Sequence, residues 1–192
     1  MTGAWICFED EAGQSLRPGK ARTWAPRGHT PVTRVSGNSG RLSAAGMACV
    51  KPGWPGRFFY RLRVHRRRKG DRASMSEADY AALVTAAHRA LKAPVVLVWD
   101  NLNTHRSQKM RQFTEANSDW LTVVHLPAYA PDLNAVEGAW ASMKSSLGNH
   151  AATSLDELEA MVRSRLRRIQ HRPDLINALL GQTGLTLQPP PP

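Results

Sequence analysis

Two short apolar runs that end in acidic residues constrain the fold of this chain more than any other feature. Val95 to Trp99 (VVLVW) contains no polar residue and is followed at once by Asp100. Ala4 to Asp10 (AWICFED) is a second apolar run that also ends in acids. Continuous apolar runs of this length are typical of strands that are covered on both faces. We therefore expect an α/β sheet in which two central strands each end in a carboxylate.

Sequence periodicity places the other elements around these two strands. Phe58, Tyr60 and Leu62 alternate with a more polar set, which predicts a strand with one wet face. Ser76 and Asp79 form a capping-box pair ahead of apolar residues at helical spacing. The predicted order begins with strands at 4–10, 41–50 and 57–64, followed by a helix from Ser76 to Pro94 and a strand at 95–99. A helix at about 105–117 and a strand at 121–126 come next. Three helices end the chain: one at about 133–147 with Asp132 as N-cap, one after Ser154, which forms a capping box with Glu157, and one at about 173–180.

This order predicts a mixed five-stranded α/β sheet flanked by helices, with an antiparallel meander first and βα crossover units after it. The length of 192 residues favours a single domain, which we place at residues 1–187. Residues 188–192 are expected to be a disordered, Pro-rich tail. Gln14 to Arg34 is rich in turn residues and is expected to form a hairpin with an irregular excursion.

The charge balance narrows the choice of partner. The chain has 26 Lys and Arg against 15 Asp and Glu, a formal net charge of +11, which favours a polyanion such as nucleic acid or an anionic membrane surface. Its apolar runs are too short for a membrane span, and no signal-peptide pattern is present. Cys7 and Cys49 each lie in an apolar segment, which suggests neither a disulfide framework nor a zinc site. We expect a cytoplasmic, nucleoid-associated protein.

The strand-terminal acids indicate a metal site. Ligands of open α/β sheets collect beyond the carboxyl ends of the strands, so neighbouring parallel strands would hold Asp10 and Asp100 side by side. Two such charges ~4 Å apart repel by roughly 4 kcal/mol at an effective dielectric of about 20. A divalent cation would remove this repulsion, and oxygen ligands favour Mg²⁺ or Mn²⁺.

Glu137 is the third candidate ligand. On the predicted helix at 133–147 it shares a face with Asn134 and Lys144, so that face offers a carboxylate, an amide and a cation. Two metal ions about 3.5 to 4 Å apart could activate a water or a 3′-hydroxyl for attack on a phosphodiester. Each acid alone also fits an ordinary turn, cap or solvated position.

Other nearby acids are alternative ligands. Glu9 and Glu11 flank Asp10 and should point to the opposite face if the strand runs that far. Asp132 is better explained as a helix N-cap.

Three segments carry a family resemblance. They are WICFEDEAG at Trp5 to Gly13, VVLVWDNLNTH at Val95 to His105, and LPAYAPDLNAVEGAW at Leu126 to Trp140. In this order they closely resemble the three catalytic blocks of bacterial insertion-sequence transposases, the IS630 group of the Tc1/mariner superfamily. RTWAPRGHTP at Arg22 to Pro31 resembles the family's hairpin region, and the resemblance extends to about Ile169.

The resemblance implies an RNase H-like fold and a DDE site in which Asp10, Asp100 and Glu137 hold two ions of Mg²⁺ or Mn²⁺. It also implies cleavage at transposon ends and joining of the 3′ ends to target DNA, typically at a TA dinucleotide, by a homodimer on DNA. Members of the family carry helix-turn-helix domains before the first catalytic strand, which here starts near Met1. We therefore expect a separate helix-turn-helix polypeptide from a split reading frame, or else a separated domain or a decayed remnant.

Several further residues are candidates for supporting roles. Asn101 and His105 follow Asp100 and are expected to orient a carboxylate or to contact DNA, although structural roles fit them equally. Trp140 is expected to be a core residue. Backbone contact with DNA is predicted for Arg61, Arg63, Arg66, Arg67, Arg68, Lys69 and Lys144, and less strongly for Arg163, Arg167 and Arg168.

Two other functions remain open at this level. An RNase H-like nuclease would use the same acids to cut DNA without joining it. An inactive DNA-binding fragment would use only the basic surface. The intact set of acids and their three ordered blocks favour the strand transferase.

Overall fold

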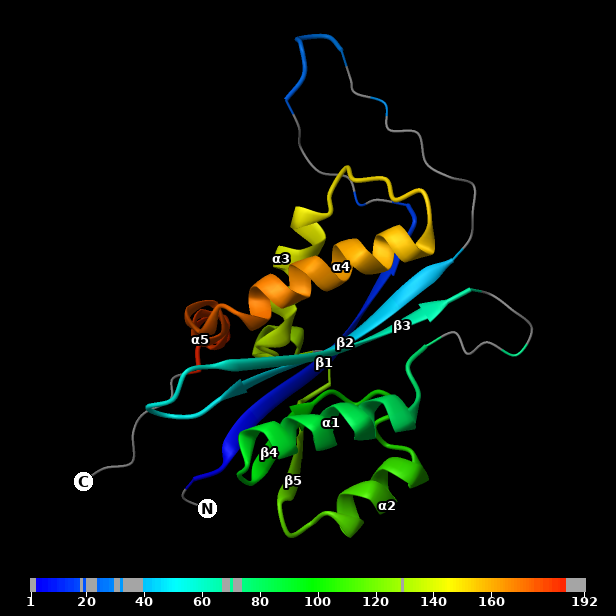
Figure 1. The fold of residues 1–192 in the computed structure, drawn as a ribbon. Helices are drawn as coiled ribbons and strands as arrows, with labels where there is room; N and C mark the ends of the chain where they lie inside the picture. Colours follow the sequence, from blue (N-terminus) through cyan, green and yellow to red (C-terminus); the bar gives the residue numbers. More distant parts are fainter. Residues whose placement is uncertain are drawn as a thin grey trace.

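A five-stranded mixed sheet forms the centre of the protein (Figure 1). The structure is a computed structural model that describes residues 3–17, 19, 24–29, 32, 40–66, 70, 74–128 and 130–185. The strands are β1 (Trp5–Ser15), β2 (Arg41–Val50), β3 (Arg57–His65), β4 (Val95–Trp99) and β5 (Leu121–His125), in the spatial order β3-β2-β1-β4-β5. The β1–β2 and β2–β3 pairs are antiparallel, and the β1–β4 and β4–β5 pairs are parallel. The predicted mixed sheet, with its meander before its parallel strands, is confirmed.

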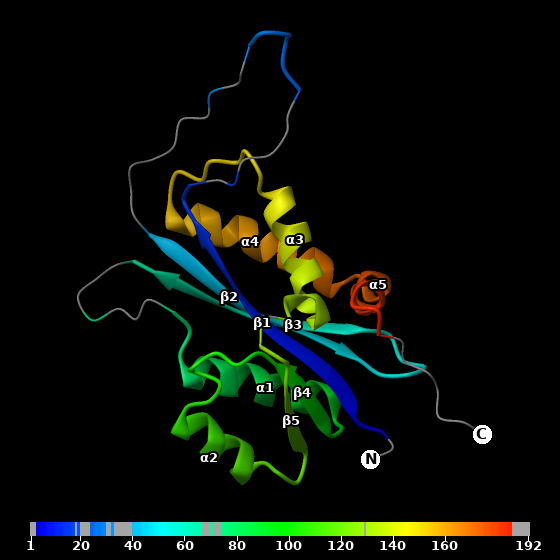
Figure 2. The same cartoon turned by 180° about the vertical axis from the view of Figure 1, so that it is seen from behind.

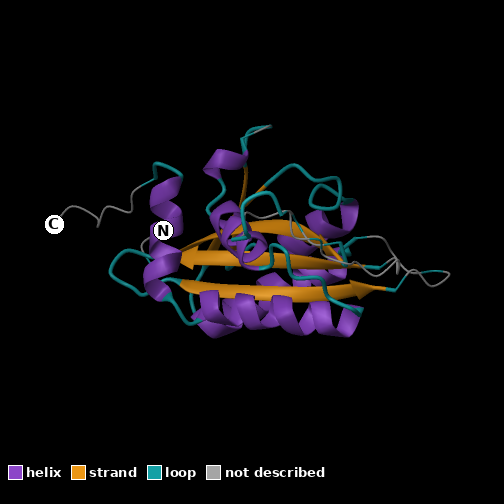
Figure 3. Ribbon diagram, turned by 90° about the horizontal axis from the view of Figure 1, so that it is seen from above, coloured by secondary structure: helices purple, strands orange, loops and turns teal. Residues whose placement is uncertain are grey.

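Helices cover both faces of this sheet (Figures 2 and 3). Against one face pack α1 (Glu77–Leu91) and α2 (Gln108–Ala116). Against the other pack α3 (Val136–Ser146), α4 (Leu155–Gln170) and α5 (Pro173–Gln182). A short 3₁₀ helix, η1 (Pro131–Leu133), precedes α3. The sheet therefore separates two hydrophobic cores.

The alternation of side chains along the strands explains the two cores. In β2, Leu42, Ala44 and Ala48 belong to the core on the α3–α5 side. Ala45, Met47 and Cys49 belong to the core on the α1 side. Successive residues of a strand point to opposite faces, so a strand covered on both faces is apolar throughout. Acids on neighbouring positions of β1 accordingly end up on different faces of the sheet.

The first strand is longer than the sequence indicates. It was expected to end at Asp10, but β1 continues to Ser15, which pairs with Arg41 of β2. Ala12 and Gly13 read locally as a turn, yet Ala12 is buried in the core on the α3–α5 side. The cross-strand hydrogen bonds to β2 therefore override the local turn signal, and Asp10 lies within a strand.

Two helix starts and one capping box also differ from expectation. Helix α3 begins at Val136, and Asp132 is not its N-cap, because Asp132 lies in η1 and the Asn134 side chain accepts the hydrogen bond from the Val136 amide. Helix α2 begins at Gln108 after the N-cap Ser107, which leaves His105 in the preceding turn. Ser154 caps α4 as predicted, but Glu157 accepts from the Thr153 amide, so the box is only half formed.

Other expectations concern the remaining segments. Cys7 and Cys49 face each other across β1 and β2 as buried free thiols. Residues 24–29 extend away from the sheet and include a turn in which the His29 amide donates to the Pro26 carbonyl (Figure 1). The rest of the Arg22–Pro31 segment and the expected tail at 188–192 lie outside the described residues. Among the described helices, none is both long and apolar enough to cross a bilayer.

Candidate active site

The parallel pairing of β1 with β4 brings two of the predicted acids together. Phe8 pairs with Val98, and continuing this register past the last paired residues brings Asp10 level with Asp100. Glu137, in the first turn of α3, faces the same space. The three acids line one cavity of about 500 Å³, together with Asn101, Leu102, Asn103, Leu126, Pro127, Ala128, Ala130, Pro131 and Asn134. The structure thus assembles the three candidate ligands in one pocket.

A buried tryptophan holds Asp10. Trp140 is only 1% exposed, and its Nε1 donates a hydrogen bond to Asp10 Oδ2 at 3.0 Å. Gly46 pairs with Asp10 across the β1–β2 ladder, and a Cβ at Gly46 would lie 2.7 Å from the Trp140 ring. The glycine therefore makes room for the indole. The core role predicted for Trp140 is confirmed, but its contact with Asp10 was missed, although a buried indole N–H generally needs an acceptor.

Hydrogen bonds from the turn after β4 hold Asp100. Its Oδ1 accepts hydrogen bonds from the Leu102 amide at 3.0 Å and from His105 Nδ1 at 2.9 Å. Burial opposes ionisation of Asp100, but the bonds from His105 and Leu102 outweigh it and lower the pKa of this carboxyl. The prediction that His105 orients a carboxylate is consistent with this contact.

The polar neighbours of the pocket connect its walls. Asn101 donates from Nδ2 to the Leu126 carbonyl at 2.7 Å and so ties the end of β4 to the segment after β5. Asn134, which is buried, donates to the Glu9 carbonyl at 2.8 Å and so ties η1 to β1. The prediction that Asn134 and Glu137 share a helix face is wrong, because Asn134 lies before the start of α3. Lys144 is exposed near the end of α3 and is not among the residues that line the pocket.

Electrostatic repulsion inside the pocket suits a cation. Burial, Glu137 and Asp100 together raise the pKa of Asp10 to about 7, against the lowering effect of hydrogen bonds from the Glu11 backbone and Trp140. No Lys or Arg is among the residues that line the pocket. Oxygen donors without a thiol fit Mg²⁺ or Mn²⁺. Among the described residues, however, no three acids or histidines lie close enough to form a preassembled metal site, so the acids share a pocket without yet converging on one point.

The alternative acids lie elsewhere. Glu9 and Glu11 point to the α1 face, as expected from strand alternation, and neither lines the pocket. Glu11 accepts a hydrogen bond from the Tyr80 hydroxyl at 2.6 Å. Glu9 is completely buried, which raises its pKa well above the usual range, with Asp10 and Asp100 adding to the rise. Asp132 lines a neighbouring cavity, which Glu137 also lines.

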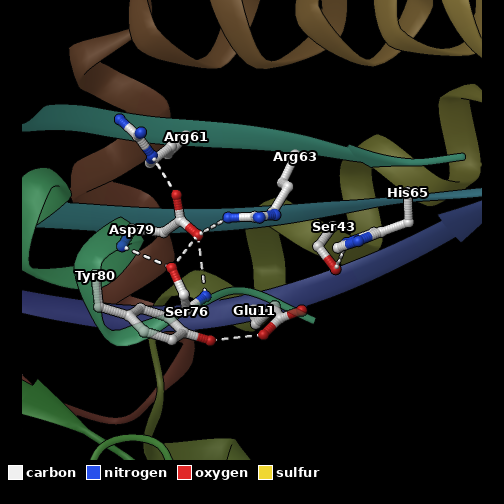
Figure 4. Close-up of polar contacts among 8 residues, drawn as sticks. All are labelled: Glu11, Ser43, Arg61, Arg63, His65, Ser76, Asp79 and Tyr80. Carbon is white, nitrogen blue, oxygen red and sulfur yellow. Dashed lines mark hydrogen bonds and ion pairs between the residues drawn. The ribbon is translucent and has the colours of Figure 1, made fainter. Parts of the chain in front are cut away.

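Most of the described arginines proposed to contact DNA are paired within the protein. Arg61 and Arg63 of β3 both bond to Asp79 of α1, at 3.0 and 2.6 Å (Figure 4). Arg66 pairs with Asp156 of α4, and Arg163 pairs with Glu159. Arg67, Arg68 and Lys69 lie outside the described residues. DNA contact by this group stays a prediction.

Comparisons with known proteins identify the family of this chain. The sequence matches the DDE superfamily endonuclease family over residues 5–159. A search of curated proteins found no match.

Solved structures show the same fold. The Mos1 mariner paired end complex with Mn has a TM-score of 0.58 and 17% identity, covering 95% of this chain and 56% of that one. The Mos1 strand transfer complex has a TM-score of 0.57 and 18% identity, covering 95% and 56%. The catalytic domain of Mos1 mariner transposase has a TM-score of 0.52 and 15% identity, covering 95% and 84%. This chain thus spans a little over half of the longer Mos1 chains and has their RNase H-like fold, and it belongs to the DDE superfamily endonuclease family.

Proposed function

We propose that this chain is the catalytic domain of a transposase of the Tc1/mariner superfamily, in the IS630 group. It would hydrolyse phosphodiesters at transposon ends and join the freed 3′-hydroxyls to target DNA. The observation that carries the proposal is the single pocket lined by Asp10, Asp100 and Glu137, in a chain whose family is that of the DDE endonucleases. A Mos1 strand transfer complex among the similar structures supports the joining step.

The three acids would hold two ions of Mg²⁺ or Mn²⁺. Bound there, the ions would lower the pKa of a water or 3′-hydroxyl and stabilise the departing oxygen. The protein's own part is to position the ligands: Trp140 fixes Asp10 and His105 fixes Asp100. Glu137 approaches from a separate helix, so the position of α3 sets the distance between the acids. A Mos1 structure with Mn among the similar structures supports the choice of ion.

DNA is the proposed partner. The net charge of +11 favours attraction to the phosphate backbone. Arg66 to Lys69 and Lys144 are the residues we propose to contact it. A homodimer would bring two transposon ends together, and the likeness to a Mos1 paired end complex supports this arrangement. End recognition would come from a helix-turn-helix polypeptide, and the assembly would work in the cytoplasm at the nucleoid.

Cleavage and joining of labelled DNA test the proposal. The wild type should nick duplex DNA in Mg²⁺ or Mn²⁺ and join a precleaved 3′-hydroxyl end to a target duplex. Asp100→Asn should do neither, whereas Asp132→Asn should do both, because Asp132 lies outside the pocket of the three acids. Nicking without joining would reduce the chain to an RNase H-like nuclease. DNA binding without either reaction would identify an inactive fragment.

A further inference from the structure

Glu9 is a buried acid that neither the pocket nor the core explains. Its side chain is 0% exposed, on the α1 face of β1. Within the described part of the chain, neither of its carboxyl oxygens has a hydrogen bond of good geometry. Burying a carboxyl without a partner is costly, so such a group persists where it has a task. His105 faces this carboxyl, with its Nε2 3.3 Å from Glu9 Oε2.

His105 connects Glu9 to the pocket. The ring is fully buried and stacks on Trp99, with centroids 4.2 Å apart and planes 4° from parallel. Tyr80 packs edge-on against it at 4.7 Å. These contacts fix the plane of the imidazole, with Nδ1 against Asp100 and Nε2 against Glu9. The chain Glu9–His105–Asp100 therefore crosses from the α1 face of the sheet to the catalytic end of β4.

The contact with Asp100 requires a proton on Nδ1. A neutral imidazole carries its proton on either nitrogen, and the Nε2–H form would turn a lone pair of Nδ1 toward the carboxylate. The Glu9 carboxyl faces Nε2 at 3.3 Å, and a proton placed between these two atoms would leave Nδ1 with its own proton for Asp100. The Leu102 and His105 bonds both use Oδ1, which leaves Oδ2 for a ligand in the pocket.

We propose that Glu9 is a positioning residue that acts through His105 to orient Asp100. This inference rests on the proposed role of Asp100 as a metal ligand. A neighbour that fixes the tautomer of a histidine beside a ligand typically changes metal affinity or activity by about 10- to 100-fold when it is removed. Glu9 lies on the face opposite Asp10, so it acts without entering the pocket.

The most direct test is the imidazole spectrum of the metal-free, DNA-free protein. Long-range ¹H–¹⁵N correlation of labelled histidine should show His105 protonated at Nδ1, with the signal assigned from its loss in His105→Gln. Glu9→Leu should remove the fixed tautomer. Glu9→Gln should keep it, because the amide donates to Nε2. Glu11→Gln is the matched control: it is the same change on the same face, and its residue contacts Tyr80.

The metal dependence of DNA cleavage gives the second readout. Glu9→Leu should raise the Mn²⁺ concentration for half-maximal cleavage by about tenfold or more, and Glu9→Gln by less than about threefold. Adding Glu9→Leu to His105→Gln should cause no further change, since the pathway is already broken. Circular dichroism confirms that each variant is folded. Should the Leu variant not fold, the Gln variant and His105→Gln carry the comparison.

Two results would overturn the inference. One is a Glu9→Leu protein whose His105 spectrum and Mn²⁺ dependence equal those of the wild type. The other is a further loss in the double variant, which would show that Glu9 acts without His105. A wild type that cleaves no DNA in either ion would contradict the proposed function, while the imidazole spectra would still decide whether Glu9 fixes His105.

Discussion

Two groups of acids in this protein are built in opposite ways. Asp79, at the start of α1, accepts hydrogen bonds from Arg61, Arg63 and the amide and hydroxyl of Ser76 (Figure 4). The pocket acids have no cation among the residues that line their cavity, and Asp10 faces Glu137 and Asp100 instead. Asp79 is balanced by two guanidiniums, whereas Asp10 is repelled by two other carboxylates.

The pKa directions express this difference. Burial opposes ionisation of Asp79, but the bonds from Ser76, Arg61 and Arg63 outweigh it and lower its pKa. Burial and the neighbouring acids raise the pKa of Asp10 to about 7. An acid with hydrogen-bond donors around it stabilises the fold, whereas an acid placed beside other acids lowers the stability until a cation binds. We therefore expect Asp79 to stabilise the fold and the pocket acids to serve the reaction.

Removing a pocket acid should have the largest effect on activity. Asp10→Asn should reduce cleavage by at least about a thousandfold, since it deletes a proposed metal ligand. It should also raise the urea midpoint of the metal-free protein at pH 7.5, because Asn keeps an acceptor for Trp140 without the charge. Asp100→Asn and Glu137→Gln should lose cleavage to the same extent. A variant that fails to fold would count against the site assignment.

Removing Asp79 should lower the stability of the fold and leave cleavage nearly unchanged. Asp79→Ala should lower the free energy of unfolding by roughly 2 to 3 kcal/mol, combining the loss of a helix cap with the loss of bonds to two half-exposed arginines. Cleavage by the folded variant at saturating Mn²⁺ should stay within about twofold of the wild type. Urea denaturation measures the first and the nicking assay the second. A stability change under about 0.5 kcal/mol would show that Asp79 does not stabilise the fold.

The free energy of unfolding should change with pH in opposite directions for Asp79 and Asp10. The folded-state pKa of Asp79 lies below its unfolded value near 3.9, so its contribution is present above that pH and is lost as the pH falls further. The pKa of Asp10 is raised, so between about pH 4 and pH 7 the folded state binds more protons than the unfolded state, and stability falls as the pH rises. In metal-free protein, Asp10→Asn should reduce the loss of stability as the pH rises from 4 to 7. Asp79→Ala should reduce the loss of stability as the pH falls below 4. Denaturant titrations across this range would refute the assignment if neither slope changed.

Trp140 tests how the pocket and the core are joined. Trp140→Phe keeps an aromatic ring in the core but removes the Nε1 bond to Asp10, and should cost about 1 kcal/mol of stability. Cleavage should fall by about tenfold through a less ordered Asp10. Equal cleavage by Trp140→Phe and the wild type would make the indole a core residue only.

Replacing Arg66, Arg67 and Arg68 should have the smallest effect on the fold. Changing Arg66, Arg67 and Arg68 to Ala removes the exposed Arg66–Asp156 pair, which is worth about 0.5 kcal/mol or less. DNA affinity should fall for all sequences, and the slope of log affinity against log salt should become shallower by about 2 to 3 units. An unchanged slope would exclude these three arginines from the DNA contact.

Local sequence signals located the elements that depend on local chemistry. The bounds of β2 and β4 match the predicted bounds, because apolar runs and flanking turn residues determine them. The three acids reach one pocket because the sheet topology follows from the order of the strands.

Contacts between distant residues could not be predicted in this way. Trp140 bonds to Asp10 across a separation of 130 residues, and Glu9 of β1 meets His105 of the turn before α2. The extension of β1 to Ser15 likewise depends on pairing with β2, which the local sequence does not show. Alternation placed Glu9 on the correct face, but a strand pattern does not reveal which side chain lies opposite.

The central claim is that the pocket acids form a divalent-cation site, and calorimetric titration of Mn²⁺ into the wild type and Asp100→Asn tests it most directly. We predict saturable binding by the wild type, with a melting temperature that rises with Mn²⁺ concentration, and neither effect in Asp100→Asn. Equal binding by the two proteins, or no binding by the wild type even with DNA present, would contradict the claim.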